Sequence, residues 1–228
     1  MAGKTARKPP PPPLDNRQRV IAALMKLLAE KPIERIGFPE IARDAGLSLG
    51  ELRGEFGTTL AIIAAMMKDV DRTVLAGIDA DLAEEPPRER LFDVLMRRLE
   101  LLAPHKAAIR SLARSASCNP GLAFALNGLA VRSQQWMLTA ADIDAAGPRG
   151  MVRAQGLALL YAQVLRVWIT DDDPGQARTM AALDRALARG QRWATFLDDL
   201  ASIPRGFRRR RRRPPDESGD TDEGTVTA

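Results

Sequence analysis

Residues of the types that carry catalysis are few in this chain of 228 residues. It contains one histidine, His105, which follows a helix-starting proline and has no obvious carboxylate partner nearby in the sequence. It also contains one cysteine, Cys118, and a cysteine nucleophile needs a neighbouring base to activate it. No glycine-rich phosphate loop of either standard spacing is present. These observations argue against an enzyme, and we expect no catalytic residue and no cofactor.

A metal ion is the other chemistry that the side chains suggest, because Asp171, Asp172 and Asp173 are consecutive. The same residues precede Pro174. Aspartate accepts hydrogen bonds from the free amides at the start of a helix, and proline suits the first helical position. The pattern therefore favours a helix start over a metal site. The single cysteine also excludes an intramolecular disulfide and a cysteine-rich zinc site, and it fits the reducing cytoplasm.

The chemistry that remains is binding, and its signature lies between residues 17 and 63. A helical run over 17–30 leads into a short apolar helix that ends at Gly46, and glycine adopts the left-handed conformation without steric cost. Ser48 and Glu51 have the spacing of a capping box that begins the next helix. Two short helices joined by so tight a turn indicate a helix-turn-helix, whose second helix can enter the major groove of DNA.

This segment resembles the N-terminal domain of TetR-family transcriptional regulators. The residues that carry the resemblance are Ala22, Ala23, Leu27, Leu28, Ile41, Ala42, Ala45, Gly46, Leu47, Ser48, Gly50, Leu52 and Phe56. It implies an all-α fold of about nine helices, with three short N-terminal helices followed by longer ones. It also implies a homodimer, in which the larger domain binds a ligand and its last two helices form the dimer interface.

The same resemblance implies a surface that binds double-stranded DNA. The residues expected at this surface are Arg17, Arg19, Ser48, Leu49, Gly50, Arg53 and Thr59. The family usually has a tyrosine where this chain has Arg53, and a phosphate-binding lysine where it has Thr59. Between residues 39 and 56 there are two cations and four anions, and an acidic surface opposes binding to phosphates. A helix-turn-helix kept only as a folding unit is therefore an alternative.

The composition is that of an ordinary globular protein, with 45% hydrophobic and 28% charged residues. Apolar residues recur at helical spacing between residues 17 and 200, which predicts an all-α fold. The basic pI of 9.9 arises mainly in the two tails. No signal peptide or membrane span is apparent, so we expect a cytoplasmic protein. The expected parts are a disordered proline-rich tail (1–15), the helix-turn-helix domain (16–57), the ligand-binding and dimerisation domain (58–203) and a disordered arginine-rich tail (204–228).

Proline, glycine and asparagine predict where the longer helices begin and end. The expected helices run over 58–82, 88–102, from Pro104 onward, over 119–141 and 149–170, and then from the aspartates before Pro174. In the helix over 88–102, one apolar face contains Leu91, Leu95, Leu99 and Leu102. The residues expected off that face are Arg88, Glu89, Arg97, Arg98 and Glu100.

The helix over 149–170 is mostly apolar, and Gln155, Gln163 and Arg166 interrupt it at spacings that place them on one side. Packed amphipathic helices can enclose an apolar cavity with a few polar groups that orient a ligand. The residues predicted to bind a small apolar ligand are Phe124, Trp136, Gln155, Tyr161, Gln163 and Arg166. Alternatively, the aromatic residues are ordinary core, and the polar ones lie at a dimer seam or in water.

The C-terminal half also resembles the lipid-binding accessory protein of ubiquinone (coenzyme Q) biosynthesis, which has a TetR-like fold and no DNA function. The residues that carry this resemblance are 98–105, Trp136, 153–161, 171–174, Leu183 and Asp184. It implies a protein that binds a lipid or an isoprenoid and does not bind DNA.

The C-terminal end suggests a membrane surface as a further partner. One apolar stripe contains Trp193, Phe196, Leu197 and Leu200, and an unbroken arginine run follows at Arg208–Arg213. Such a helix with a polybasic run can hold a protein to an anionic membrane surface. The same run could instead add non-specific affinity for DNA phosphates. A solvated tail is the third interpretation.

The leading hypothesis is a cytoplasmic, homodimeric, TetR-like transcriptional regulator, in which a small apolar ligand and DNA compete through one two-state element. The alternative is a lipid- or isoprenoid-binding accessory protein that does not bind DNA. A helical interaction module that binds neither ligand nor DNA is the third possibility.

Overall fold

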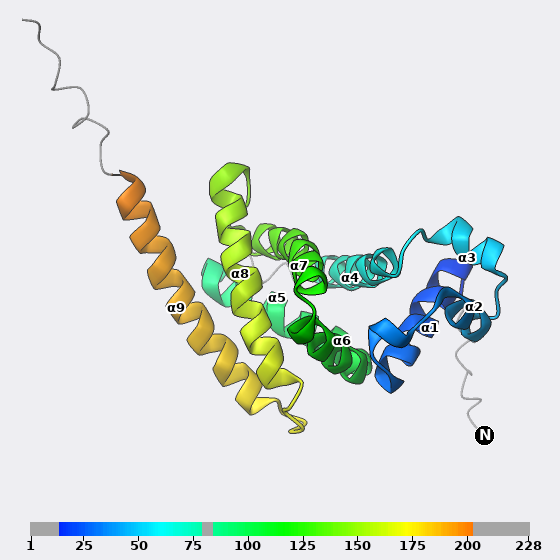
Figure 1. Cartoon of the computed structure of the whole chain (residues 1–228). Coiled ribbons are helices and arrows are strands. Elements are labelled where there is room, and N and C mark those ends of the chain that lie inside the picture. Colours follow the sequence, from blue (N-terminus) through cyan, green and yellow to red (C-terminus); the bar gives the residue numbers. More distant parts are fainter. Residues whose placement is uncertain (1–13, 79–83, 203–228) are drawn as a thin grey trace, which may run out of the picture. The chain divides into compact units, whose positions relative to one another are not determined.

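A computed structural model describes residues 14–78 and 84–202, with side chains up to residue 190. The chain divides into two compact units, residues 1–191 and 192–228. All regular structure in the described residues is helical, which confirms the predicted fold class (Figure 1). Among these residues, none of the helices is both long enough and apolar enough to cross a membrane.

The N-terminal helices are short and begin or end at identifiable residues. They are α1 (Asn16–Glu30), the 3-10 helix η1 (Ile33–Arg35), α2 (Phe38–Ala45) and α3 (Leu49–Glu55). Helix α1 begins at Asp15, whose side chain accepts a hydrogen bond from the amide of Gln18 at 2.7 Å. Such a cap satisfies one of the amides that the first turn of a helix leaves free.

The longer helices follow in the predicted order. They are α4 (Thr59–Ala76), α5 (Pro87–Leu102), the 3-10 helix η3 (Ala103–His105), α6 (Lys106–Cys118), α7 (Pro120–Ala140), α8 (Gly147–Trp168) and α9 (Ala177–Ser202). Helix α7 begins as expected at Asn119, whose side chain accepts from the amide of Leu122 at 3.0 Å.

Two predicted boundaries are wrong in detail. Helix α4 ends at Ala76, earlier than the expected residue 82, because Gly77 stops the helix and its carbonyl accepts a hydrogen bond from Arg97. Residues 79–83 lie outside the described part of the chain. Helix α9 begins at Ala177, so Pro174 precedes the helix and is not its first residue.

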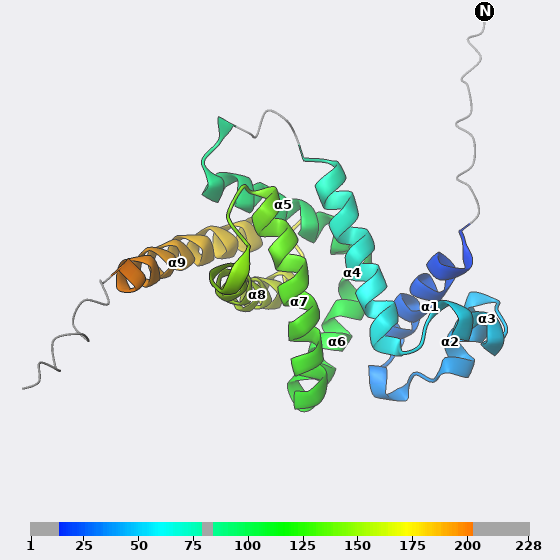
Figure 2. The same ribbon diagram turned by 90° about the horizontal axis from the view of Figure 1, so that it is seen from above.

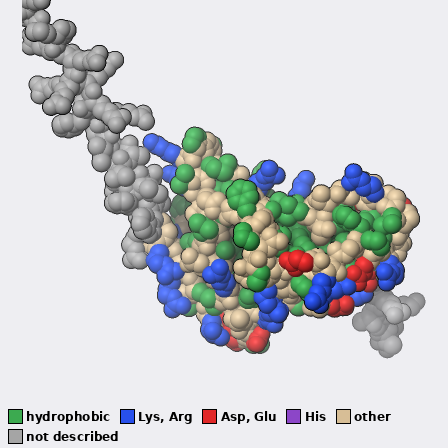
Figure 3. Space-filling model, viewed as in Figure 1, with side chains coloured by type: hydrophobic (Ala, Val, Ile, Leu, Met, Phe, Trp, Pro, Cys, Tyr) green, Lys and Arg blue, Asp and Glu red, His purple; other side chains and the backbone are tan. Residues whose placement is uncertain are grey.

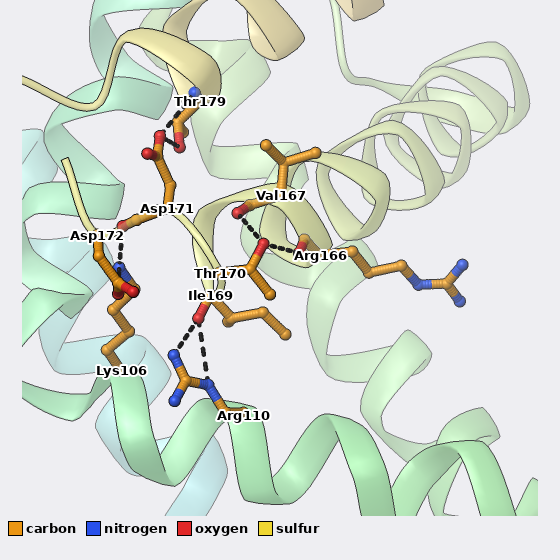
Figure 4. Close-up of polar contacts among 9 residues, drawn as sticks. All are labelled: Lys106, Arg110, Arg166, Val167, Ile169, Thr170, Asp171, Asp172 and Thr179. Atoms are coloured by element: carbon orange, nitrogen blue, oxygen red, sulfur yellow. Dashed lines mark hydrogen bonds and ion pairs between the residues drawn. The ribbon is translucent and has the colours of Figure 1, made fainter.

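The aspartates before α9 nevertheless satisfy backbone amides, as a helix start requires. Asp171 accepts from the amide and the hydroxyl of Thr179 at 2.9 and 2.7 Å. Asp173 accepts from the amide of Ala177 at 3.2 Å. These bonds hold the connection between α8 and α9 and leave its two ends close together (Figure 4).

A continuous apolar core connects the N-terminal helices to the longer ones within residues 1–191. Helix α1 buries Val20, Leu24 and Leu28 completely, and it packs against α2, α3, α4 and α6 (Figures 1 and 2). The helix-turn-helix segment therefore packs against α6 as well as α4, and these two longer helices set its orientation.

The predicted apolar face of α5 is confirmed. Its four leucines, Leu91, Leu95, Leu99 and Leu102, are all buried. Helix α5 packs against α4 and α7, and α7 packs in turn against α8. Leu183 and Leu187 on the first half of α9 are buried as well. Burial of apolar surface on this scale is the main stabilising contribution to a helical fold.

Candidate functional site

The turn between α2 and α3 has the geometry that its sequence predicts. Gly46 ends α2 with φ 64° and ψ 39°, in the left-handed region. The amide of Leu47 donates to the carbonyl of Ala42 at 2.9 Å, which closes the turn. From α1, the guanidinium of Arg19 donates to the carbonyl of Gly46 at 2.8 Å. The turn is therefore both locally closed and attached to the first helix.

The predicted capping box at the start of α3 is confirmed. The hydroxyl of Ser48 accepts from the amide of Glu51 at 3.2 Å, and the carboxylate of Glu51 accepts from the amide of Ser48 at 2.8 Å. These hydrogen bonds with Ser48 lower the pKa of Glu51 below its ordinary value. The carboxylate thus serves the start of α3, and the positive charge of Arg19 on α1 lowers its pKa further.

Helix α3 buries one side and presents the other to solvent. Leu52 is buried, whereas Leu49, Gly50 and Arg53 are exposed. A side chain built at Gly50 would meet only the hydroxyl of Ser48, at 3.9 Å, so a partner could approach the backbone closely there. We call Leu49, Gly50 and Arg53 the α3 face. A helix that enters a major groove needs an exposed face of this kind.

The two acidic residues of α2 form ion pairs with lysines from outside residues 39–56. Glu40 pairs with Lys31, and Asp44 pairs with Lys26 at 2.7 Å. Figure 3 shows acidic and basic side chains next to one another over α1 and α2. Surface pairs of this kind contribute little to stability, about 0–1 kcal/mol. Their importance here is that cations outside residues 39–56 neutralise two of the anions that oppose DNA binding.

The remaining residues of the predicted DNA surface mostly support the fold. Arg19 and Ser48 hold the turn and the capping box as described above. The guanidinium of Arg17 lies over the ring of Phe56, with its central carbon 5.3 Å from the ring centre. Thr59 is the first residue of α4, but its neighbour Thr58 provides the cap, accepting from the amide of Ala61 at 3.0 Å. A direct DNA contact by these residues stays a prediction.

The six residues predicted to bind a ligand are not brought together. Phe124 and Trp136 on α7 are 80% and 59% exposed, and Gln163 and Arg166 on α8 are exposed too. Figure 3 shows hydrophobic side chains over α7 and α8 on the face in view, and Figure 4 shows Arg166 pointing away from the neighbouring polar contacts. The physical reason is that other residues occupy the buried faces of both helices.

The last two of those six lie inside the protein but in different environments. Gln155 is half-buried and exchanges two hydrogen bonds with Asn127, at 2.9 and 3.1 Å, between α8 and α7. Tyr161 is 3% exposed and lies deep among the helices. The structure does not bring the six residues together in one pocket wall, so their role in ligand binding stays a prediction, and Tyr161 belongs to another arrangement.

That arrangement is a buried polar cluster, formed by Asp71 on α4, Arg98 on α5, Ser133 on α7 and Tyr161 on α8. One carboxylate oxygen of Asp71 accepts from Nε of Arg98 at 3.1 Å and from the hydroxyl of Ser133 at 2.8 Å. The guanidinium carbon of Arg98 lies 5.1 Å from the centre of the Tyr161 ring. Four helices thus converge on one ion pair in the interior.

Arg98 corrects the prediction that this residue lies off the buried face of α5. It is 3% exposed, because it lies one turn from Leu95 and Leu102 on the apolar side. A buried guanidinium is tolerated only where an opposite charge compensates it. That charge comes from Asp71, on a different helix and 27 residues earlier, so the apolar pattern of α5 alone could not reveal it.

Two buried polar atoms of this interior have no partner at both the distance and the angle of a hydrogen bond within the described residues, although one of them faces the Arg98 guanidinium. They are the hydroxyl oxygen of Tyr161 and Oε1 of Gln134, whose side chain is 1% exposed. Gln134 follows Ser133 on the buried side of α7. Burial raises the pKa of Tyr161, and the positive charge of Arg98 opposes that rise only in part. The phenol is therefore protonated near neutral pH and keeps a hydrogen to donate.

Helix α6 is attached at both ends. At its N-terminal end, Lys106 donates to the carbonyl of Asp171 and Arg110 donates to that of Ile169, beyond the end of α8 (Figure 4). In the middle of the helix, the hydroxyl of Ser111 donates to the carbonyl of Lys31 at 3.2 Å. Near the C-terminal end, the hydroxyl of Ser115 donates to the carboxylate of Glu34 in η1 at 2.9 Å. Helix α6 therefore connects the end of α8 directly to the helix-turn-helix segment.

Comparisons with known proteins agree with this architecture. No family model matches the chain. Among curated proteins it is similar to the HTH-type transcriptional regulator PksA of Bacillus subtilis, with 31% identity over 97 residues. That match spans 42% of this chain and 46% of PksA, so it covers less than half of the relative.

Solved structures of TetR regulators share the fold over most of the chain. The TetR transcriptional regulator from Nitrosomonas europaea matches with a TM-score of 0.62 and 21% identity, covering 78% of this chain and 99% of that one. A TetR regulator from Rhodococcus sp. RHA1 matches with a TM-score of 0.55 and 23% identity, covering 77% and 95%. A TetR-family regulator from Streptomyces coelicolor gives 0.54 and 16%, covering 81% and 84%. This chain has the fold of TetR transcriptional regulators.

Proposed function

We propose that this protein is a transcriptional regulator that binds double-stranded DNA through the α3 face. The observation that carries the proposal is the exposure of Leu49, Gly50 and Arg53 on a helix whose start and orientation are held by local hydrogen bonds. The similarity to PksA supports the same function. Arg53 would bind a phosphate or a base edge, and Leu49 would make apolar contact in the groove.

The charge pairs on α1 and α2 support this proposal over a helix-turn-helix kept only as a folding unit. The acidic residues Glu40, Asp44 and Glu51 each have a partner within the domain. With Lys26 and Lys31 added to Arg43 and Arg53, four cations balance the four anions of residues 39–56. Neutralising phosphates with such cations is the main source of affinity for DNA.

We further propose that two copies of the chain form a homodimer that binds two half-sites. The outward side of α8 supports this, because Val152 and Leu159 are exposed there on either side of Gly156. Exposed apolar residues on adjoining helices mark interaction surfaces. Sedimentation velocity of the full-length chain tests this part, and a monomer at every concentration would contradict it.

A ligand in the larger part of the chain would act by changing the relation between the two DNA-binding segments. Helices α4 and α6 both contact α1, so a shift of either helix reaches the helix-turn-helix. A ligand that favours one of two arrangements lowers the affinity for DNA by the same free energy with which DNA lowers the affinity for the ligand. We propose regulation of this kind by a small, mainly apolar molecule.

Selection of genomic DNA fragments tests the DNA-binding proposal. The chain is used in a form ending at Gly206, because Arg208–Arg213 alone would retain DNA without sequence preference. Enrichment of one short, near-palindromic site is the expected result. Arg53→Ala should then weaken binding to that site by about 10-fold to 100-fold, since a good side-chain contact to a base discriminates by about 1–3 kcal/mol.

A matched control is Arg72→Ala, which removes an exposed arginine in the middle of α4. It should leave the affinity for the selected site unchanged. Equal losses in both variants would indicate only non-specific attraction. Failure to enrich any site would contradict the proposal and favour the accessory protein that binds a lipid or an isoprenoid. The membrane attachment predicted for that protein involves the side chains of 193–200 and the run Arg208–Arg213, which lie outside the described residues.

A further inference from the structure

We propose that the buried polar cluster binds the uncharged head group of an otherwise apolar molecule, with a hydroxyl or a primary amide as the recognised group. This inference rests on the proposed ligand-regulated function and specifies the class of ligand. The cluster is Asp71, Arg98, Ser133 and Tyr161, with Gln134 as the neighbouring acceptor on α7. None of the ligand residues expected from the sequence, except Tyr161, belongs to it.

The first argument is hydrogen bonding. The hydroxyl of Tyr161 and Oε1 of Gln134 are buried and have no partner among the described residues. Burying a polar atom without a hydrogen bond is unfavourable, and native proteins rarely retain such atoms without a reason. A hydroxyl or primary amide contains both a donor and an acceptor. It can therefore donate to an acceptor such as Gln134 Oε1 or accept from the Tyr161 phenol.

The second argument is charge. Arg98 is the cation of the cluster and Asp71 already compensates it, with 3.1 Å between Nε and the carboxylate. A carboxylate or phosphate on the ligand would leave two anions for one guanidinium. An ammonium group would leave two cations for one carboxylate. Because an uncompensated charge in the interior is strongly unfavourable, the cluster should reject both charged classes.

The third argument is the surroundings. On α5, Arg98 is flanked on its own side by Leu95 and Leu102, and both are buried. On α8, Tyr161 lies between Leu157 and Val164, also buried. A polar head group at the cluster would therefore continue into apolar side chains. Sites with few polar groups in an apolar lining are typical for small ligands.

Thermal unfolding of the full-length protein with four probes of equal chain length tests the head-group class. The probes are 1-octanol, octanamide, octanoate and octylamine at pH 7, where the last two are charged. We expect 1-octanol or octanamide to raise the Tm by about 2–4 °C when its concentration exceeds the Kd several-fold. Octanoate and octylamine should leave the Tm unchanged or lower it.

Two variants connect the shift to the cluster. Tyr161→Phe removes only the hydroxyl, so this variant should fold with an undiminished Tm in the absence of probe. Gln134→Met replaces the whole side-chain amide, including the buried Oε1, by an apolar side chain of similar size. Each should lose the greater part of the shift that the neutral probes cause. Gln163→Leu, at an exposed position on α8, is the control and should retain the shift.

A larger shift with octanoate than with 1-octanol would overturn the proposal, because it would show that Arg98 recruits an anion. No shift with any probe would overturn it too, and would leave an ordered water as the partner of these atoms. An equal shift in Tyr161→Phe would place the probe elsewhere. These measurements contain no DNA, so the head-group class can fail while the fragment selection succeeds, and the reverse.

Discussion

The turn between α2 and α3 differs from the buried polar cluster in how its hydrogen-bonding groups are satisfied. In the turn, Ser48 and Glu51 satisfy each other over three residues, and Arg19 satisfies the carbonyl of Gly46 from the nearest helix. In the cluster, Ser133 and Asp71 are 62 residues apart in the chain. Their neighbour Tyr161 has a hydroxyl without a partner.

This difference indicates different tasks. A segment whose polar groups are all used internally keeps one shape, and a fixed shape is what a DNA-reading helix needs. An interior with open hydrogen-bonding atoms can gain interactions when another molecule enters. This contrast fits the proposals that the first region presents a surface to DNA and the second accepts a ligand. Each prediction below tests one side of this contrast.

The largest effect is expected from breaking the ion pair in the cluster. Arg98→Met leaves the Asp71 carboxylate buried without a cation, and should lower the free energy of unfolding by about 3–5 kcal/mol. Urea denaturation of the full-length chain measures this. The double variant Asp71→Leu with Arg98→Met should recover much of the loss, because no buried charge then remains. A single variant as stable as the original chain would show that water reaches Asp71.

The next effect is expected at the turn. Gly46→Ala puts a side chain into the left-handed region, with the new carbon only 2.7 Å from a nitrogen of Arg19. It should lower the free energy of unfolding by about 1–2 kcal/mol, the usual cost of that conformation. It should also weaken specific DNA binding, because it displaces the residue that attaches α1 to the turn.

Gly54→Ala on α3 is the matched control, since a side chain there meets nothing within 4 Å. Alanine favours helix over glycine by about 0.5–1 kcal/mol, so this variant should be more stable. Urea denaturation of both variants makes the comparison. The same sign of change in both would contradict the assigned role of Gly46.

The smallest effect is a pH dependence from the capping box. Hydrogen bonds with Ser48 keep the pKa of Glu51 below its ordinary value in the folded chain. The stabilisation is therefore present above the unfolded-state pKa of about 4.3 and disappears as the pH falls through the lower folded-state pKa. Glu51→Gln should be less stable at pH 7, and the difference between the two chains should shrink as the pH falls below the unfolded-state pKa. A constant difference in urea midpoint across this range would contradict the assignment.

Interactions over a few residues were predictable from the sequence. The start of α3 at Ser48, the end of α2 at Gly46 and the apolar face of α5 all depend on residues three or four positions apart. Helical spacing also gave the all-α fold. The end of α4 was misplaced because the stop at Gly77 is reinforced by Arg97 from α5, which is a contact between helices.

The interior site could not be predicted in this way. Arg98 looks like a surface residue in its own helix, and its partner Asp71 belongs to a helix with its own spacing. Phe124 and Trp136 have the residue types of a pocket wall, yet the buried face of α7 is formed by Met137 and Leu138. Which face of a helix is buried depends on its neighbours. A charged residue within an apolar stripe, as at Arg98, was the one signal available.

The attachment of α6 at both ends has a consequence for recombining this protein with its relatives. Consider a chimaera that joins a foreign helix-turn-helix to this chain at the start of α4. It would keep the covalent connection but lose the native packing of α1 against α6. The hydroxyl of Ser111 would then lie opposite a foreign segment in place of the Lys31 carbonyl to which it donates here. The N-terminal helices should therefore be exchanged together with the surface of α6 that contacts them, or the hybrid should lose the coupling between its two parts.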